Sequence, residues 1–156
     1  MTDELLSEVH GLWRGADAGV LSTTSVAVPG YPFGSVVPYV TTPEGRPVIY
    51  VSGLAQHTKN LAADPRCCVT VVEAGGDAQA GWRISLLGDA APVEGAEREA
   101  IAARYYARFP ASARFAETHD FAFWAITPRR VRYIAGFGKI HWIEAEAWLG
   151  ADPQAR

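Results

Sequence analysis

The sequence lacks most features that would assign it to a specialised class of protein. Its 156 residues include only two cysteines and one methionine, and 14 Lys and Arg nearly balance 17 Asp and Glu. The resulting net charge of −3 argues against nucleic-acid binding through bulk electrostatic attraction. No apolar run reaches the roughly 18 residues that a membrane-spanning helix needs. We therefore expect neither a nucleic-acid partner nor a membrane partner.

The two cysteines and the amino terminus indicate a reducing compartment. Cys67 and Cys68 are adjacent in a strand-like run, so their side chains should point to opposite faces and not form a disulfide with each other. Two neighbouring cysteines without spaced partners also make no metal site. The first residues, Met1–Glu4, are acidic and do not resemble a signal peptide. We expect a cytoplasmic protein with reduced thiols and no bound metal.

The pattern of short apolar segments predicts a mainly β (α+β) fold: an antiparallel split barrel of six or seven strands with accessory helices. Residues 1–17 should form an N-terminal docking helix, residues 18–149 the barrel domain, and residues 150–156 a tail. Pro38 should lie at an edge, a bulge or a gap in the sheet. Pro128 should split two strands, and residues 136–143 should be irregular because two glycines interrupt them.

The segment from Arg46 to Arg66 contains the most distinctive local pattern. A buried strand, 47–52, is followed by a Ser-Gly break and a short helix, 55–63, whose first turn contains His57, Thr58 and Lys59. A helix start has unpaired N–H groups and positive potential, so this turn could bind a phosphate. The alternative is a surface helix with a polar first turn. Arg83, predicted on the strand face opposite the core, could complete a pocket for a phosphorylated ligand if that face meets the helix.

Catalytic motifs of hydrolases and phosphate-loop proteins are absent from the sequence. We find no GxSxG, no HExxH and no Walker loop. The residues instead carry a family resemblance. The order SVVPYV, RPVIYVSGLAQHTKNLAADPRCCVTVVE, GWRISLLGDAAPV and GFGKIHWI resembles the FMN-binding split-barrel family related to pyridoxamine 5′-phosphate oxidase. The resemblance is greatest to the haem-utilisation (haem oxygenase-like) branch, and it covers about Ala18 to Ile143.

The resemblance implies a set of FMN contacts and a homodimer with the cofactor at the subunit interface. Ser35 and either Tyr39 or Val40 stand where the oxidases have basic residues, and GFGKIHWI does not match their substrate-phosphate motif, so vitamin B6 synthesis is not expected. The contacts implied for the isoalloxazine, the ribityl chain and the phosphate are Val36, Val37, Pro38, Tyr50, Val51, Ser52, His57, Thr58, Lys59 and, at the ring edge, Arg83.

Three functions are consistent with these observations. The first is an FMN-dependent oxidoreductase that transfers hydride or electrons to a small-molecule acceptor, with Lys139 and His141 as candidate catalytic groups or, alternatively, exposed loop residues. The second is a haem-binding or haem-degrading protein with His141 or His57 as axial ligand. The third is a non-catalytic dimer that binds flavin or a deazaflavin. Five Trp, six Tyr and six Phe also favour a dimer interface, unless most of them are core.

Overall fold

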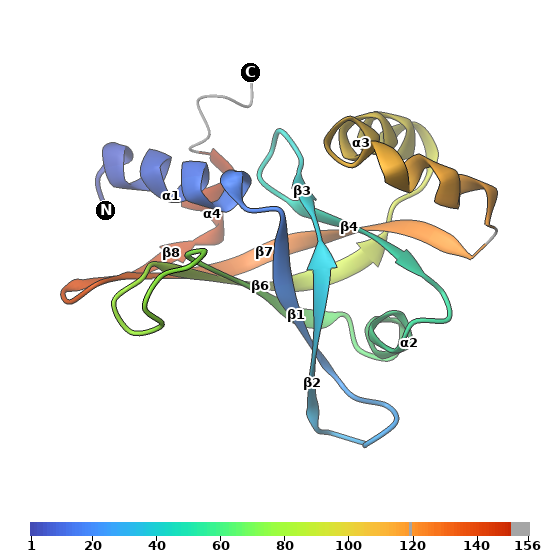
Figure 1. Cartoon of the computed structure of the whole chain (residues 1–156), viewed down its shortest axis with the longest axis horizontal. Coiled ribbons are helices and arrows are strands. Elements are labelled where there is room, and N and C mark those ends of the chain that lie inside the picture. The colour runs from blue at the N-terminus through green and yellow to red at the C-terminus, as the bar shows by residue number, and fades with distance from the viewer. Residues whose placement is uncertain (119, 151–156) are drawn as a thin grey trace.

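The computed structural model describes residues 1–118 and 120–150, which form one curled antiparallel sheet with helices around it (Figure 1). The strands are β1 (Ala18–Thr24), β2 (Pro32–Pro38), β3 (Val40–Thr41), β4 (Pro47–Ser52), β5 (Arg66–Val72), β6 (Arg83–Pro92), β7 (Phe121–Ala135) and β8 (Lys139–Glu144). The helices are α1 (Asp3–Gly15), α2 (Gln56–Ala63), α3 (Gly95–Arg108), the 3₁₀ helix η1 (Pro110–Glu117) and α4 (Ala145–Gly150).

The strand order is β2-β1-β5-β6-β7-β4-β3, with β8 paired to β7, and every pairing is antiparallel. The predicted class, an antiparallel barrel-like sheet with accessory helices, is confirmed. The sheet has eight strands instead of six or seven, because the chain turns at Tyr39 to form the two-residue strand β3 and because β8 is regular. No helix in residues 1–118 or 120–150 is long and apolar enough to cross a membrane.

One face of the sheet carries the main core, and the other face is also buried where β4 and β7 meet α3. A row of directly paired residues crosses the first of these faces from β1 to β8 and forms the centre of the main core: Leu21, Val69, Leu86, Val131 and Ile143. Helices α1 and α4 cover this core with Trp13 and Trp148. A second apolar cluster lies between α3 and strands β4 and β7 and includes Tyr50, Tyr105 and Phe123.

Helix α1 forms where the sequence predicts it. Thr2 caps its start by accepting a hydrogen bond from the Leu5 amide at 3.2 Å, and Asp3 and Glu4 complement the positive end of the helix. Its apolar face is buried against the sheet, as expected of a docking helix. The domain boundaries at residues 17 and 150 stay a prediction, and residues 151–156 lie outside the described part of the chain.

The prediction that Pro128 splits two strands is wrong, because β7 runs unbroken from Phe121 to Ala135. The register between β6 and β7 shifts at this point: Leu87 pairs with Arg130, whereas Gly88 pairs with Pro128. Such a bulge accommodates a proline without ending the strand. Gly88 makes the close approach possible, because a Cβ there would collide with the Thr127 carbonyl oxygen.

The prediction of an irregular segment at 136–143 is also wrong. Residues Lys139–Glu144 form β8, which makes a tight hairpin with β7. The two glycines permit the turn: Gly136 and Gly138 have φ angles of 55° and 103°, which L-residues rarely adopt.

Two local predictions are confirmed. Pro38 ends β2, which lies at one end of the strand order, and the next residue turns the chain toward β3. Cys67 is buried on the core side, whereas Cys68 is partly exposed on the other side, and both are free thiols.

Candidate functional site

The turn between β4 and α2 is shaped by hydrogen bonds from its own residues. Thr58 is buried and its hydroxyl donates to the Ser52 carbonyl at 2.6 Å. The helix begins after Ala55, whose side chain offers no cap. The first amide groups of α2 therefore have no side-chain acceptor, and Lys59 lies exposed beside them. This arrangement retains an anion-attracting helix start, but it commits the Thr58 hydroxyl proton to the protein.

Asn60 links α2 to β1 through side-chain hydrogen bonds, a role that the sequence analysis did not predict. Its side chain is fully buried, and its amide donates to the Thr23 hydroxyl at 3.0 Å. Its carbonyl oxygen accepts from the Val26 amide at 3.1 Å. A buried amide with both ends satisfied fixes the orientation of the helix, and hence the direction of His57. The sequence signal that could have indicated this role is an asparagine among the apolar positions of a short helix.

His57 has one ring nitrogen engaged and one without a partner. Its Nδ1 lies 3.2 Å from the Ser35 hydroxyl on β2. Its Nε2 is buried and has no hydrogen-bond partner among the described residues. Burial lowers the pKa of His57, so the ring is neutral at pH 7. A neutral imidazole with one nitrogen held by a hydroxyl and the other unpartnered is suited to bind a ligand or a metal ion.

An aromatic cavity of about 350 Å³ lies between the sheet and the α3–η1 segment. We call it the aromatic cavity, and its lining residues are Pro38, Tyr50, Tyr105, Phe109, Ala111, Ser112, Arg114, Phe115 and Phe121. Tyr50 forms part of the wall and packs edge-on against Tyr105, with ring centroids 5.5 Å apart. Apolar walls with a few polar groups are typical of sites for planar organic ligands.

Strand β4 runs from the aromatic cavity, at Tyr50, to the α2 turn, at Ser52. This residue pairs with Phe121 of the cavity wall across β4 and β7, and its hydroxyl donates to the Asp120 carboxylate. On the same strand, Tyr50 lines the cavity. Ser52, two residues further along, accepts a hydrogen bond from the Thr58 hydroxyl through its backbone carbonyl. One short stretch of β4 therefore joins the apolar cavity to the helix that carries His57.

The residues implied as FMN contacts, apart from Arg83, separate into four groups in one protomer. Pro38 and Tyr50 line the aromatic cavity, and Ser52, His57, Thr58 and Lys59 form the adjoining turn and helix start. Val37 and Val51 are buried in the core and offer only backbone atoms to a ligand. Val36 is 74% exposed on the opposite face of the sheet.

Arg83, Lys139 and His141 lie away from α2. Arg83 is on the face opposite the core, as predicted, and its guanidinium donates to the carbonyls of Ala78 and Gln79, each at 3.3 Å. Lys139 and His141 belong to the β7–β8 hairpin, which projects from the end of the sheet opposite α2 (Figure 1). Any role for these three side chains beside His57 therefore requires a second protomer. Their functions stay a prediction.

The side of the sheet opposite the core is unusually apolar. We call it the outer face. Directly paired residues cross it in one row: Val36, Val20, Thr70, Ser85, Arg132 and Trp142. The guanidinium groups of Arg130 and Arg132 lie 4.6 and 4.8 Å from the Trp142 ring centroid. The exposed large apolar residues of this face are Val20, Val36, Val72, Leu87, Ile140 and Trp142.

Among the described residues, no group of three or more His, Cys, Asp and Glu side chains is placed to hold a metal ion.

The fold is that of a split-barrel protein with an apolar cavity lined in part by strand β4. Residues 10–150 match the family model described as the CREG β-barrel, and the chain belongs to that family. It is structurally related to pyridoxamine phosphate oxidase-like and haem-utilisation proteins, as the sequence motifs implied.

Two relatives are similar over nearly the whole chain. The non-canonical haem oxygenase HOZ of Arabidopsis thaliana is 37% identical over 146 residues, which cover 94% of this chain and 43% of that protein. A haem-binding protein from Mycobacterium smegmatis is 30% identical, with a TM-score of 0.84 over 96% of this chain and 60% of that one. The chain thus spans less than two thirds of both relatives. At 19% identity, Campylobacter jejuni ChuZ shares the fold, with a TM-score of 0.82 over 92% of this chain and 61% of that one.

Proposed function

We propose that this protein binds haem against the wall of the aromatic cavity, with His57, which does not itself line the cavity, turning toward it as the axial ligand of the iron. The observation that carries the proposal is the buried Nε2 of His57, which has no hydrogen-bond partner among the described residues. A free lone pair on Nε2 requires the ring proton to be on Nδ1, and that N–H can donate a hydrogen bond to the Ser35 hydroxyl oxygen 3.2 Å away. The neutral ring at pH 7 meets the remaining requirement of a metal ligand.

The wall of the cavity fits the rest of such a ligand. The aromatic rings of Tyr50, Phe115 and Phe121 provide apolar surface for a macrocycle. Arg114 lines the same cavity and has its guanidinium 5.0 Å from the Phe115 ring centroid. An arginine in this position would pair with a propionate carboxylate through charge-assisted hydrogen bonds. Support also comes from the two relatives above, which are named for haem chemistry or haem binding.

The proposal predicts that His57 variants lose haem coordination. Titrating haemin into the wild-type protein should produce a Soret band of a histidine-coordinated haem. His57→Ala should abolish that spectrum and weaken haemin binding at least tenfold, because the iron–nitrogen bond is lost while the apolar cavity remains. His141→Ala is the matched control and should bind as the wild type does. Loss of the band in His141→Ala, with retention in His57→Ala, would contradict the assignment.

A second candidate, FMN binding, rests on the uncapped start of α2. The first amides of the helix and the exposed Lys59 could hold a phosphate. If FMN is the ligand, the protein should quench flavin fluorescence on titration, and Lys59→Ala should weaken binding several-fold while leaving haemin binding unchanged. Two observations make this candidate weaker. The Thr58 hydroxyl already donates its proton to the Ser52 carbonyl. Tyr39, at or next to a position where the oxidases have a basic residue, is buried and its hydroxyl donates to the Trp13 carbonyl.

We also propose haem breakdown as the activity of the loaded protein, an oxidoreductase function of the kind named for the Arabidopsis relative. Bound haem supplies the iron at which oxygen and a reductant react. The chain itself would orient the ring through the aromatic wall and exclude water from it. Ascorbate added in air to the complex should bleach the Soret band, and free iron should appear in a chelator assay. A stable band would identify a haem carrier.

The outer face is proposed as a homodimer interface. Such a face would bury six large apolar side chains. Val36→Glu should convert the dimer to a monomer in analytical ultracentrifugation, because a carboxylate would be desolvated in the interface. The control is Val28→Glu, whose side chain is 55% exposed in the β1–β2 turn, away from the face. A wild-type monomer at micromolar concentration would contradict the proposal.

A further inference from the structure

Two tyrosines of the aromatic cavity have hydroxyl protons that no group in residues 1–118 and 120–150 accepts. Tyr50 and Tyr105 line the cavity, and their side chains are only 7% and 3% exposed. The Tyr50 hydroxyl accepts a hydrogen bond from the Tyr106 hydroxyl at 3.1 Å, which leaves its own proton unused. The Tyr105 hydroxyl makes no hydrogen bond within this part of the chain. Each of the two lining tyrosines can therefore donate one further hydrogen bond.

Aromatic neighbours hold both rings in place. Tyr50 stacks on Phe123 with ring centroids 4.2 Å apart and an interplanar angle of 16°, and the Phe121 ring lies 5.2 Å away. Tyr105 packs edge-on against Phe123, also at 5.5 Å. Close packing of this kind leaves a ring few alternative rotamers. The two hydroxyls are therefore positioned by the fold before a ligand binds, so that little conformational entropy is lost when they are used.

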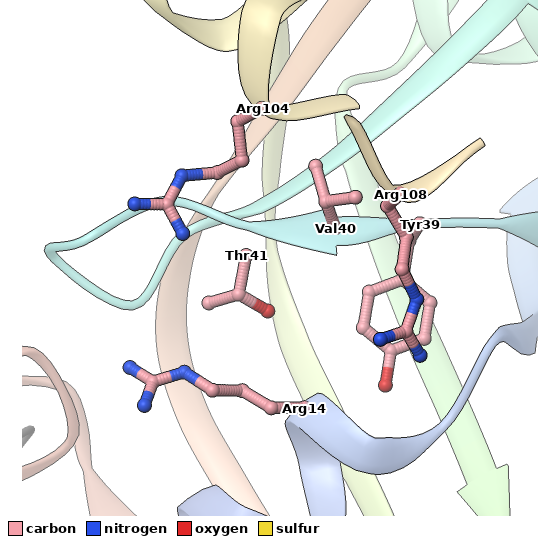
Figure 2. A pocket seen from close by; sticks show the side chains of 6 residues that line it. All are labelled: Arg14, Tyr39, Val40, Thr41, Arg104 and Arg108. Carbon is pink, nitrogen blue, oxygen red and sulfur yellow. The ribbon is translucent and has the colours of Figure 1, made fainter. Parts of the chain in front are cut away.

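The other polar groups nearby are committed elsewhere, with one exception. The Ser112 hydroxyl donates to the Phe109 carbonyl at 2.6 Å. Arg104 and Arg108, on another side of α3, line a separate space (Figure 2). Among the residues that line the aromatic cavity, only Arg114 is charged. The cavity thus combines two neutral O–H donors and one cation with apolar walls, and this combination suits a ligand whose oxygen acceptor is negatively charged.

A ligand that fills the aromatic cavity has to satisfy these donors. It displaces solvent from the two hydroxyls, and a buried O–H without an acceptor weakens binding by roughly tenfold. A site of this kind rejects analogues that lack the acceptor. If haem is the ligand, as proposed above, its only oxygen atoms are those of its two propionate groups.

We propose that the hydroxyls of Tyr50 and Tyr105 donate hydrogen bonds to a propionate of the bound haem and so place the carboxylate edge of the macrocycle in the aromatic cavity. The inference rests on the proposed haem function and adds two specificity-determining residues to it. An ionised carboxylate accepts stronger hydrogen bonds than a neutral oxygen does. Burial raises the pKa of Tyr105 to about 12, so its hydroxyl keeps its proton at neutral pH.

The test is a fluorescence titration with protoporphyrin IX, which lacks iron and therefore does not need His57, and with its dimethyl ester, which lacks the negative charges. Tyr50→Phe and Tyr105→Phe each keep the ring and remove one O–H. Each should weaken binding of the acid by roughly tenfold and leave binding of the ester within about twofold. Tyr106→Phe is the matched control, because it removes a hydroxyl from the same cluster but not from the cavity lining. It should bind both porphyrins as the wild type does.

Three results would overturn the inference while porphyrin binding itself persists. Both tyrosine variants bind the acid as tightly as the wild type, or they lose acid and ester equally, which is the signature of lost packing. The third is a loss in Tyr106→Phe as large as that in Tyr50→Phe. The proposed function fails by a separate measurement, the haemin titration of His57→Ala. A Soret band that is independent of His57, together with the tyrosine effects on the acid, would remove the axial assignment and support this inference.

Discussion

Truncating Trp148 to alanine is expected to lower the free energy of unfolding by about 3 to 5 kcal/mol. The side chain is fully buried where α4 meets α1 and the turn after β3. Its ring stacks on His10 with centroids 3.9 Å apart and meets Trp13 edge-on at 5.9 Å. Its Nε1 donates to the Gly45 carbonyl at 2.8 Å. The substitution removes all of these contacts and leaves a cavity, and urea denaturation followed by circular dichroism would measure the loss.

Trp148→Phe separates packing from hydrogen bonding. Phenylalanine retains most of the aromatic contacts but leaves the Gly45 carbonyl without its donor, which costs about 1 to 3 kcal/mol. The phenylalanine variant should therefore lie between the wild type and the alanine variant. If alanine costs less than about 1 kcal/mol, the expectation that Trp148 stabilises the contact between α4 and α1 is contradicted. Equal losses in the two variants would assign the whole effect to the hydrogen bond.

Acidification is expected to destabilise the fold through His10. This histidine is only 2% exposed, and burial, with a smaller contribution from Arg14, lowers its pKa from 6.5 to about 4. Between these values the unfolded chain binds a proton and the folded chain does not. The contribution of His10 is therefore fully present above pH 6.5 and is lost as the pH falls toward 4. A lowering of this size corresponds to about 3 kcal/mol.

His10→Phe isolates this contribution. Phenylalanine can keep the stacking on Trp148 but cannot bind a proton. Its free energy of unfolding should change about 3 kcal/mol less than that of the wild type between pH 7 and pH 4. Carboxylates with lowered pKa values, such as Asp64 and Asp77, are present in both proteins and cancel in the comparison. Parallel pH profiles for the two proteins would show that His10 is protonated in the folded state without penalty.

Most elements of the fold could be predicted from local patterns, and the errors have identifiable causes. The helix at α1 and the strands β1, β4 and β5 follow from periodicity because each has an apolar face or a continuous buried run. The prediction at Pro128 failed because a proline interrupts a strand only where the neighbouring strand requires its N–H as a hydrogen-bond donor. The bulge opposite Pro128 removes that requirement. The prediction of an irregular segment at 136–143 failed because two glycines suggest flexibility, whereas here they form the tight turn that lets residues 139–144 pair with β7.

The candidate site could be predicted only in part. The stretch from Tyr50 to Lys59 was identified because a strand, a turn and a helix start follow one another in the chain. The aromatic cavity was not, because Pro38, Tyr50, Tyr105 and Phe121 come from distant segments and each alone is consistent with ordinary core packing. Arg83 was correctly placed on the face opposite the core, yet its distance from α2 depends on the strand order.

The sequence by itself determined the family, the mainly antiparallel architecture and the identity of the helix that carries His57. These properties depend on residue types and spacings within single segments, where side-chain period and turn chemistry act locally. Only the tertiary structure decided that His57 Nε2 is buried with no hydrogen-bond partner in residues 1–118 and 120–150, and that Ser35 stands beside Nδ1. The physical reason is that burial, desolvation and charge repulsion are properties of neighbours in space, and those neighbours are set by how the strands pair.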